Sequence, residues 1–173
     1  AGSYSGDATI DFAEANLANA DMSGSTLTAD GGFATIDFAK ANLANADLSG
    51  STLTADGGYG TATIDFAEAT LADADMSGST LTADGTGFSG DATIDFEGAN
   101  LANADLSGTT LAADGGYNGD VLIDFTEANL ANADMSGSTL TAATGSYGIA
   151  LIDFTEANLA NADLSGSKLT ADG

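Results

Sequence analysis

The sequence contains no histidine, arginine or cysteine, and its two basic residues are Lys40 and Lys168. With 26 acidic residues its formal net charge is −24, so it has no cationic surface that could displace counterions from nucleic-acid phosphates. An anionic membrane would repel the chain for the same reason, and no run approaches the roughly 20 apolar residues of a membrane span. We expect no nucleic acid and no membrane insertion. The charge leaves cations, basic proteins, neutral surfaces such as sugars or ice, and copies of the chain as partners.

The missing residue types also bear on catalysis. Without cysteine there is no disulfide framework and no thiolate metal site. An active site needs an asymmetric set of acid, base and electrostatic stabiliser, whereas serine and aspartate occur here in repeated settings. The sequence therefore predicts a protein that is not an enzyme and that has no cofactor.

Large apolar residues are scarce. Leu, Ile, Val and Phe together number 33 of 173 residues, a level that in an acidic chain borders on intrinsic disorder. An ordered fold therefore requires an architecture that needs few large side chains per residue.

An internal repeat supplies that architecture. The tripeptide IDF recurs at intervals of 26, 28, 30, 29 and 29 residues, and each copy begins a block of 20 residues, "IDFAEANLANADMSGSTLTA" in the first. The block divides into four pentapeptides, IDFAE, ANLAN, ADMSG and STLTA. The repeat predicts one domain over residues 1–173 with six coils, which begin near Ile10, Ile36, Ile64, Ile94, Ile123 and Ile152.

The pentapeptides resemble those of the pentapeptide-repeat family, whose pattern is A(D/N)LXX. The segment "ANLAN ADLSG" at 41–50 is especially similar, and the resemblance extends over all six copies. It implies an all-β fold, a right-handed parallel quadrilateral β-solenoid in which four pentapeptides form the four sides of each coil.

The pattern of side chains agrees with this fold. In each pentapeptide the central residue and the small residue two positions earlier can point inward, as Phe12 and Ile10 do in the first. Stacked coils then bury each layer against the next, so a chain poor in leucine can build a continuous core.

Between the 20-residue blocks lie 6 to 10 further residues, rich in glycine and Asp-Gly turns. We expect them to form loops at one corner, each with a single aromatic residue. Stacking would align these rings in a column that serves as a second minor core, a sticky lateral seam or a carbohydrate-stacking surface. The loop aromatics are Tyr4, Phe33, Tyr59, Phe88, Tyr117 and Tyr147.

Strict repetition places like residues in columns about 4.8 Å apart. Two acidic columns should be solvated and screened by salt, since adjacent carboxylates repel by roughly 1 kcal/mol even in water. Bridging by Ca²⁺ or another hard cation is the alternative. The candidate metal column is Asp11, Asp37, Asp65, Asp95, Asp124 and Asp153, and the second column is Asp21, Asp47, Asp75, Asp105, Asp134 and Asp163. An asparagine column, Asn16, Asn42, Asn100, Asn129 and Asn158, is expected to be structural.

The pentapeptide STLTA places two threonine columns outward on one face. Regular T-x-T arrays on a flat solenoid face resemble those of insect hyperactive antifreeze proteins, although threonine is also simply a good strand residue. Ala112 and Lys168 interrupt the array. The threonine face is predicted to comprise Thr26, Thr28, Thr52, Thr54, Thr80, Thr82, Thr110, Thr139 and Thr141.

The two ends of the sequence read as halves of one connection between coils. Gly173 followed by Ala1 would reproduce the segment after Asp84 with one extra residue, and neither end shows a capping segment. The ends predict head-to-tail stacking into a filament, or an excerpt of a longer repeat protein. The predicted junction comprises Tyr4, Asp7, Ile10, Leu164, Leu169 and Asp172.

Three functions follow from these patterns. The first is a structural protein that self-assembles head to tail into an extracellular or cell-surface filament. The second is an ice-binding protein that uses the threonine face. The third is an acidic DNA mimic, because some pentapeptide-repeat proteins bind gyrase as an anionic rod.

Overall fold

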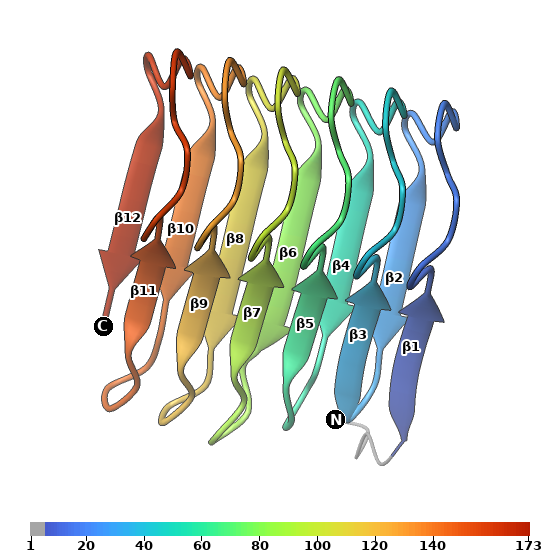
Figure 1. Cartoon of the computed structure of the whole chain (residues 1–173). Helices are drawn as coiled ribbons and strands as arrows, with labels where there is room; N and C mark the ends of the chain where they lie inside the picture. The colour runs from blue at the N-terminus through green and yellow to red at the C-terminus, as the bar shows by residue number, and fades with distance from the viewer. Residues whose placement is uncertain (1–5) are drawn as a thin grey trace.

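The computed structural model describes residues 6–173, which form twelve β-strands in two six-stranded parallel sheets (Figure 1). No helix in this range could cross a membrane. Sheet I consists of β1 (Asp7–Asp11), β3 (Phe33–Asp37), β5 (Ala62–Asp65), β7 (Ala92–Asp95), β9 (Val121–Asp124) and β11 (Ala150–Asp153). Sheet II consists of β2 (Thr26–Asp30), β4 (Thr52–Asp56), β6 (Thr80–Gly85), β8 (Thr110–Gly115), β10 (Thr139–Ala143) and β12 (Lys168–Asp172).

Each strand pairs with its equivalent in the next coil without any shift in register. Ile10 lies opposite Ile36 in sheet I, and Leu27 lies opposite Leu53 in sheet II. The two remaining sides of the coil are short and pair through isolated bridges, such as the one between Asn16 and Asn42. The predicted all-β parallel solenoid of six coils is confirmed.

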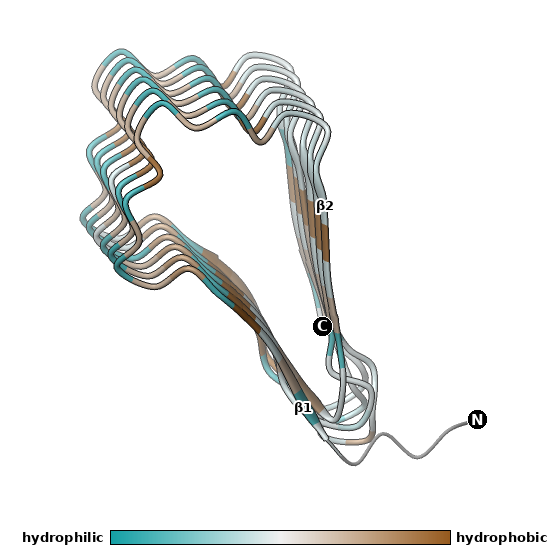
Figure 2. Ribbon diagram, turned by 90° about the vertical axis from the view of Figure 1, so that its right-hand side faces the viewer, coloured by the Kyte–Doolittle hydropathy of each residue, from teal (hydrophilic) through white to brown (hydrophobic). Residues whose placement is uncertain are grey.

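The cross-section of the solenoid is a wedge (Figure 2). The two sheets converge toward the end where one coil connects to the next, and the opposite end is stepped. The connections lie at one corner as expected, and both sheets also extend into the connecting residues. Between β2 and β3, for example, only Gly31 and Gly32 lie outside the strands. The extension follows from Ala29 and Ala34, which alternate with polar residues and are buried, so that the strand pattern continues beyond the pentapeptides.

Three corners of each coil use the same backbone device. The last residue of each of the first three pentapeptides has a left-handed conformation, with φ of 59° at Glu14, 60° at Asn19 and 62° at Gly24. Two residues after the aspartate of the first pentapeptide, a backbone N–H is accepted by that aspartate's Oδ1, as from Ala13 to Asp11 at 2.9 Å. Asparagine and glycine adopt the left-handed conformation readily, which explains their recurrence at the fifth position.

The core is built from single columns of identical residues. The Phe rings stack with centroids 4.8–5.0 Å apart and planes within 11° of parallel. In the interior coils these rings and the central leucines and methionines are fully buried. The inward positions inferred from the repeat are confirmed. The Phe column is Phe12, Phe38, Phe66, Phe96, Phe125 and Phe154.

The connections between coils pack on one another through glycine. A Cβ added at Gly119 would overlap the carbonyl oxygen of Gly90, and one added at Gly148 would overlap that of Gly119. Gly60 has the same relation to Gly32. Glycine is therefore required there because consecutive backbones touch.

We expect Gly119→Ala to lower the free energy of unfolding by about 2 kcal/mol, because the added methyl group forces two packed backbones apart. Urea unfolding followed by circular dichroism measures the change. Asn118→Ala is the control, since Asn118 is exposed in the same connection. Equal stability of the two variants would contradict the packing argument.

Candidate functional site

The threonine face lies on the outer surface of sheet II. Its first column runs from Thr26 to Lys168 and its second from Thr28 to Thr170, with one residue from each strand of the sheet. Ten of the twelve positions are threonine, and Ala112 and Lys168 occupy the other two. Parallel strands place neighbouring threonines about 4.8 Å apart across the sheet and roughly 6.7 Å apart along a strand. Sheet II therefore presents a regular two-column lattice.

The hydroxyls of this lattice are free to contact solvent. Within residues 6–173, the threonine hydroxyls that donate hydrogen bonds to protein groups belong to Thr109, Thr144 and Thr155, none of which lies on the face. Toward the coil connections the lattice is bounded by a third outward column, which is acidic. This column is Asp30, Asp56, Asp84, Asp114, Ala143 and Asp172.

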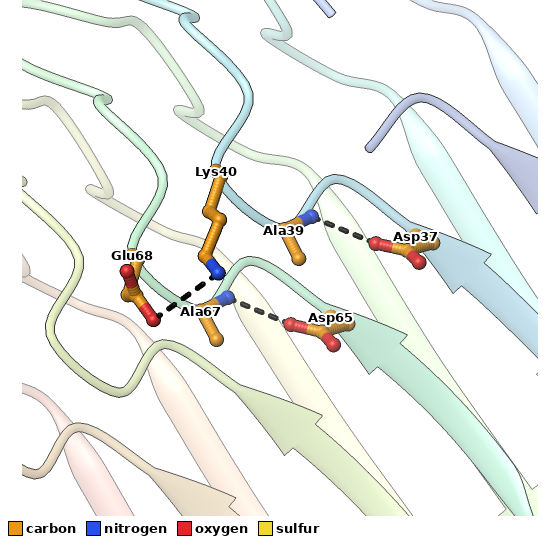
Figure 3. Close-up of polar contacts among 6 residues, drawn as sticks. All are labelled: Asp37, Ala39, Lys40, Asp65, Ala67 and Glu68. Carbon is orange, nitrogen blue, oxygen red and sulfur yellow. Dashed lines mark hydrogen bonds and ion pairs between the residues drawn. The ribbon is translucent and has the colours of Figure 1, made fainter. Parts of the chain in front are cut away.

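The two predicted acidic columns lie at corners, and each of their aspartates accepts a backbone hydrogen bond that stabilises a turn. In the column that begins with Asp11, Oδ1 accepts the backbone N–H two residues later at 2.7–2.9 Å in all six coils. In the column that begins with Asp21, the equivalent bond is 2.8–3.1 Å. Figure 3 shows two members of the first column, Asp37 and Asp65, and also the ion pair of Lys40 with Glu68 at 3.7 Å. The aspartates thus have a structural role that is independent of any ion.

Burial raises the pKa of two central members of the first acidic column, Asp65 and Asp95, whereas hydrogen bonds from Thr155 lower the pKa of Asp153 at its end. Desolvation raises the pKa of Asp95 above its ordinary value, with a smaller contribution from the charges of Asp65 and Asp124. The pKa of Asp65 is raised by the same two causes, burial first and the charge of Asp37 second. At the exposed Asp21 a hydrogen bond from the Ser23 hydroxyl lowers the pKa instead.

The geometry brings some of the candidate metal ligands together. Carboxylate oxygens of Asp95, Glu97 and Asp124 lie within 4.8 Å of one another, which places them in range of a shared hard cation. A Ca²⁺ role for this column stays a prediction.

Asparagines stack along the solenoid as expected. Asn42 donates from Nδ2 to Oδ1 of Asn16 at 3.3 Å, and Asn158 donates to Asn129 at 3.0 Å. A second amide column, which the sequence reasoning missed, occupies the left-handed corner: Asn132 donates to Asn103 at 3.2 Å. Both columns tie one coil to the next.

The loop aromatics are mostly exposed. Phe88 and Tyr117 stack at 5.6 Å, and Tyr117 meets Tyr147 edge to face at 5.2 Å. The exposed fractions are 58% at Phe33, 70% at Tyr59, 67% at Phe88, 45% at Tyr117 and 75% at Tyr147. These exposed rings therefore do not form a minor core, and the ring contacts among them join Phe88, Tyr117 and Tyr147. Tyr4 lies outside the described residues.

The residues predicted for the junction lie in the first and last coils, at opposite ends of the solenoid (Figure 1). Asp7 and Ile10 belong to β1, and Leu169 and Asp172 belong to β12. Leu164 packs against the core from the last coil, and Tyr4 is again outside the described range.

The sequence analysis did not identify one cluster of exposed apolar residues. On the outer face of sheet I, Leu122, Leu151 and Ile149 line a shallow hollow with Asp91 and Asp120. Its lining also includes Thr93 and Val121. The sequence already contains part of this cluster, because leucine replaces an outward threonine in two coils. Ile149 could be assigned to the same cluster only when the register of the connections was known.

We expect Asp95→Asn to stabilise the protein at neutral pH, because the amide still accepts the N–H of Glu97 and removes a desolvated charge. The native state binds a proton at Asp95 more readily than the unfolded chain does, since the pKa is raised from 3.8. The ionised carboxyl therefore costs stability above pH 3.8, and the cost disappears as the pH falls.

Thermal melts across pH 3 to 8 test this expectation. The advantage of Asp95→Asn should shrink with falling pH, and Asp95→Ala should destabilise because it loses the acceptor. An advantage of Asp95→Asn that persisted unchanged in acid would contradict the electrostatic explanation.

The comparisons with known proteins agree with the repeat. A family model described as pentapeptide repeats matches eight copies, at residues 94–112, 123–146 and 152–170. No curated protein matches the sequence. Among solved structures, the pentapeptide-repeat protein Rfr23 from the cyanobacterium Cyanothece 51142 is 18% identical, with coverage of 90% of this chain and 87% of that one and a TM-score of 0.22. A trypsin-treated form of QnrB1, a plasmid-mediated fluoroquinolone resistance protein, is 15% identical, with coverage of 91% and 78% and a TM-score of 0.24.

At these TM-scores the two structures carry no weight, and the assignment depends on the family model and on the coils themselves. The in-register pairing runs from each coil to the next and joins the third coil to the fourth, so the first three coils continue the solenoid of the three that the family model matches, with the same left-handed corners. Pentapeptide-repeat proteins are generally structural or binding proteins and not enzymes. The chain therefore contains repeats like those of the pentapeptide-repeat family, which the family model matches in its last three coils.

Proposed function

We propose that the protein is a non-enzymatic ice-binding protein and that the threonine face is its binding surface. The observation that carries this proposal is the two-column lattice, in which ten of twelve outward positions are threonine. A surface that binds a crystal must be regular over several repeats, and the in-register pairing of six strands supplies that regularity.

The chemistry of threonine suits a water lattice. Each hydroxyl donates one hydrogen bond and accepts others, and each methyl group restricts the water beside it. Because the side chains are β-branched and the strands hold their backbones, little rotamer freedom is lost on binding. The hydroxyls make no competing bond within the described residues, which leaves them available for ordered water. Such a role places the protein outside the cell or at its surface.

The substitution of two central threonines tests the proposal. We expect Thr54→Lys with Thr82→Lys to abolish most thermal hysteresis, because long charged side chains lift the lattice away from ice and hold their own hydration shells. Nanolitre osmometry measures the hysteresis.

The matched control is Thr35→Lys with Thr63→Lys, which alters the outer face of sheet I at equivalent central positions. This control should retain the activity of the parent. A parent without thermal hysteresis, or equal losses in both double variants, would contradict ice binding by this face.

A second candidate function is end-to-end association of copies into filaments. Core side chains of the last coil are exposed, 37% at Leu159 and 44% at Leu169, whereas the equivalent Leu130 and Leu140 are fully buried. The first coil of a second copy offers the same columns of side chains to cover them, beginning with Ile10 and Phe12.

Electron microscopy of the purified 173-residue chain tests this association. We expect filaments that Leu169→Lys shortens or abolishes, because a charge would then lie in the stacked core. Monodisperse particles at every salt concentration would contradict filament formation. Gyrase inhibition as a DNA mimic stays a prediction, for which a supercoiling assay is the test.

A further inference from the structure

The outer face of sheet I changes its chemistry in the last two coils. Its central column is threonine in the first four coils, Thr9, Thr35, Thr63 and Thr93, and leucine in the last two, Leu122 and Leu151. The fold does not require leucine at these positions, because four coils of the same geometry have threonine.

A second departure from the repeat enlarges the apolar area. Ile149 stands beside Leu151, in the column that holds Asp91 and Asp120 in the two preceding coils. Ile149 is 67% exposed and Leu151 is 44% exposed. The inward core at this level is already filled by Val121 and Ile123, so the outward leucines and isoleucine add nothing to it. Together Leu122, Ile149 and Leu151 form what we call the apolar hollow.

Carboxylates flank the apolar hollow on both sides. Asp91 and Asp120 lie toward the connections, and Asp124 and Asp153 lie two residues beyond the leucines, at the corner. Asp91, Asp120 and Asp124 each use one oxygen to accept a backbone N–H, which leaves the other oxygen to meet a cation.

Charge complementarity selects the kind of partner. A second copy would bring 26 more acidic residues and two lysines, so contact between two hollows would place carboxylates against carboxylates. The chain's two lysines lie away from the hollow: Lys40 pairs with Glu68 at a corner, and Lys168 lies on sheet II. An anionic membrane is repelled in the same way. A cationic partner with apolar side chains could cover the apolar hollow and neutralise the carboxylates at its rim.

We propose that the apolar hollow and its acidic rim bind a basic amphipathic polypeptide segment. Its apolar side chains cover Leu122, Ile149 and Leu151, and its lysines or arginines pair with the free oxygens of Asp91, Asp120 and Asp124. The site lies on sheet I and is independent of the threonine face on sheet II, so a ligand on one sheet leaves the other uncovered.

The chain's own repeat provides the variant for the test. Leu122→Thr with Leu151→Thr restores the residue found at this register in the first four coils, so the fold is preserved. The probe is a fluorescein-labelled peptide of alternating leucine and lysine, and a matched peptide has serine in place of leucine. Fluorescence anisotropy at low and high salt gives the affinity.

We expect the parent to bind the leucine-lysine peptide at least about tenfold more tightly than the double variant does, a difference of about 1.4 kcal/mol. The serine-lysine peptide should not distinguish the two proteins. Thr54→Ser with Thr82→Ser, on the opposite sheet, should bind as the parent does. Asp124→Asn should weaken binding at low salt and flatten its salt dependence.

Three results would overturn the proposal. Equal affinity of the parent and the leucine double variant would mean that the peptide binds the polyanion and not the hollow. A parent dimer in sedimentation that becomes monomeric in the leucine double variant would assign the hollow to a second copy. Binding of neutral phosphatidylcholine vesicles that the same variant loses would assign it to lipid.

Discussion

The structure depends on one constraint, which is that each coil pairs with the next in register. Parallel pairing joins Ile10 to Ile36 and Thr26 to Thr52, and it continues in this way through all six coils. Every residue then lies on its own equivalent, about 4.8 Å away. Phenylalanine stacks on phenylalanine and asparagine donates a hydrogen bond to asparagine, and both contacts stabilise the stacked coils. Aspartate must also lie on aspartate, which carries an electrostatic cost.

The corners explain why the acidic columns persist despite that cost. A sharp turn leaves a backbone N–H without a strand partner, and the aspartate Oδ1 accepts it. An unpaired N–H in a half-buried corner would cost about 1–3 kcal/mol, which equals or exceeds the repulsion of roughly 1 kcal/mol between neighbouring carboxylates in water. Asparagine performs the same task at the second pentapeptide, where Asn42 accepts the N–H of Ala44. Charge is therefore a by-product of capping at these corners, and burial at Asp95 shows where it becomes costly.

Much of this architecture could be predicted from the sequence, because strict repetition turns a sequence position into a spatial column. The six coils, the inward phenylalanines and the two threonine columns all follow from the spacing of IDF and the alternation in STLTA. The left-handed corners were harder to foresee, since Glu14 and Lys40 occupy a conformation that favours glycine or asparagine. The connections could not be predicted, because their lengths differ and their strand register depends on backbone contacts at Gly60, Gly90 and Gly119. Ile149 joined Leu151 in one cluster only once that register was known.

In a protein of this kind, the strict positions and the exceptions carry different information. A position that stays constant in all six coils, such as the inward Phe column, is demanded by stacking and says little about partners. The threonine columns are less constrained, because Ala112 and Lys168 show that the fold accepts other residues there. Threonine at ten such positions is what the proposed ice-binding role, which extends along the solenoid, would require. The leucines at 122 and 151 differ from the threonine found at the same register in the first four coils, on an outward column where stacking does not fix the residue type. Such a change, confined to two coils, suits a partner that binds at one level of the solenoid. Because the two features occupy opposite sheets of the wedge, one rigid solenoid can present an extended surface on one side and a local site on the other (Figure 2).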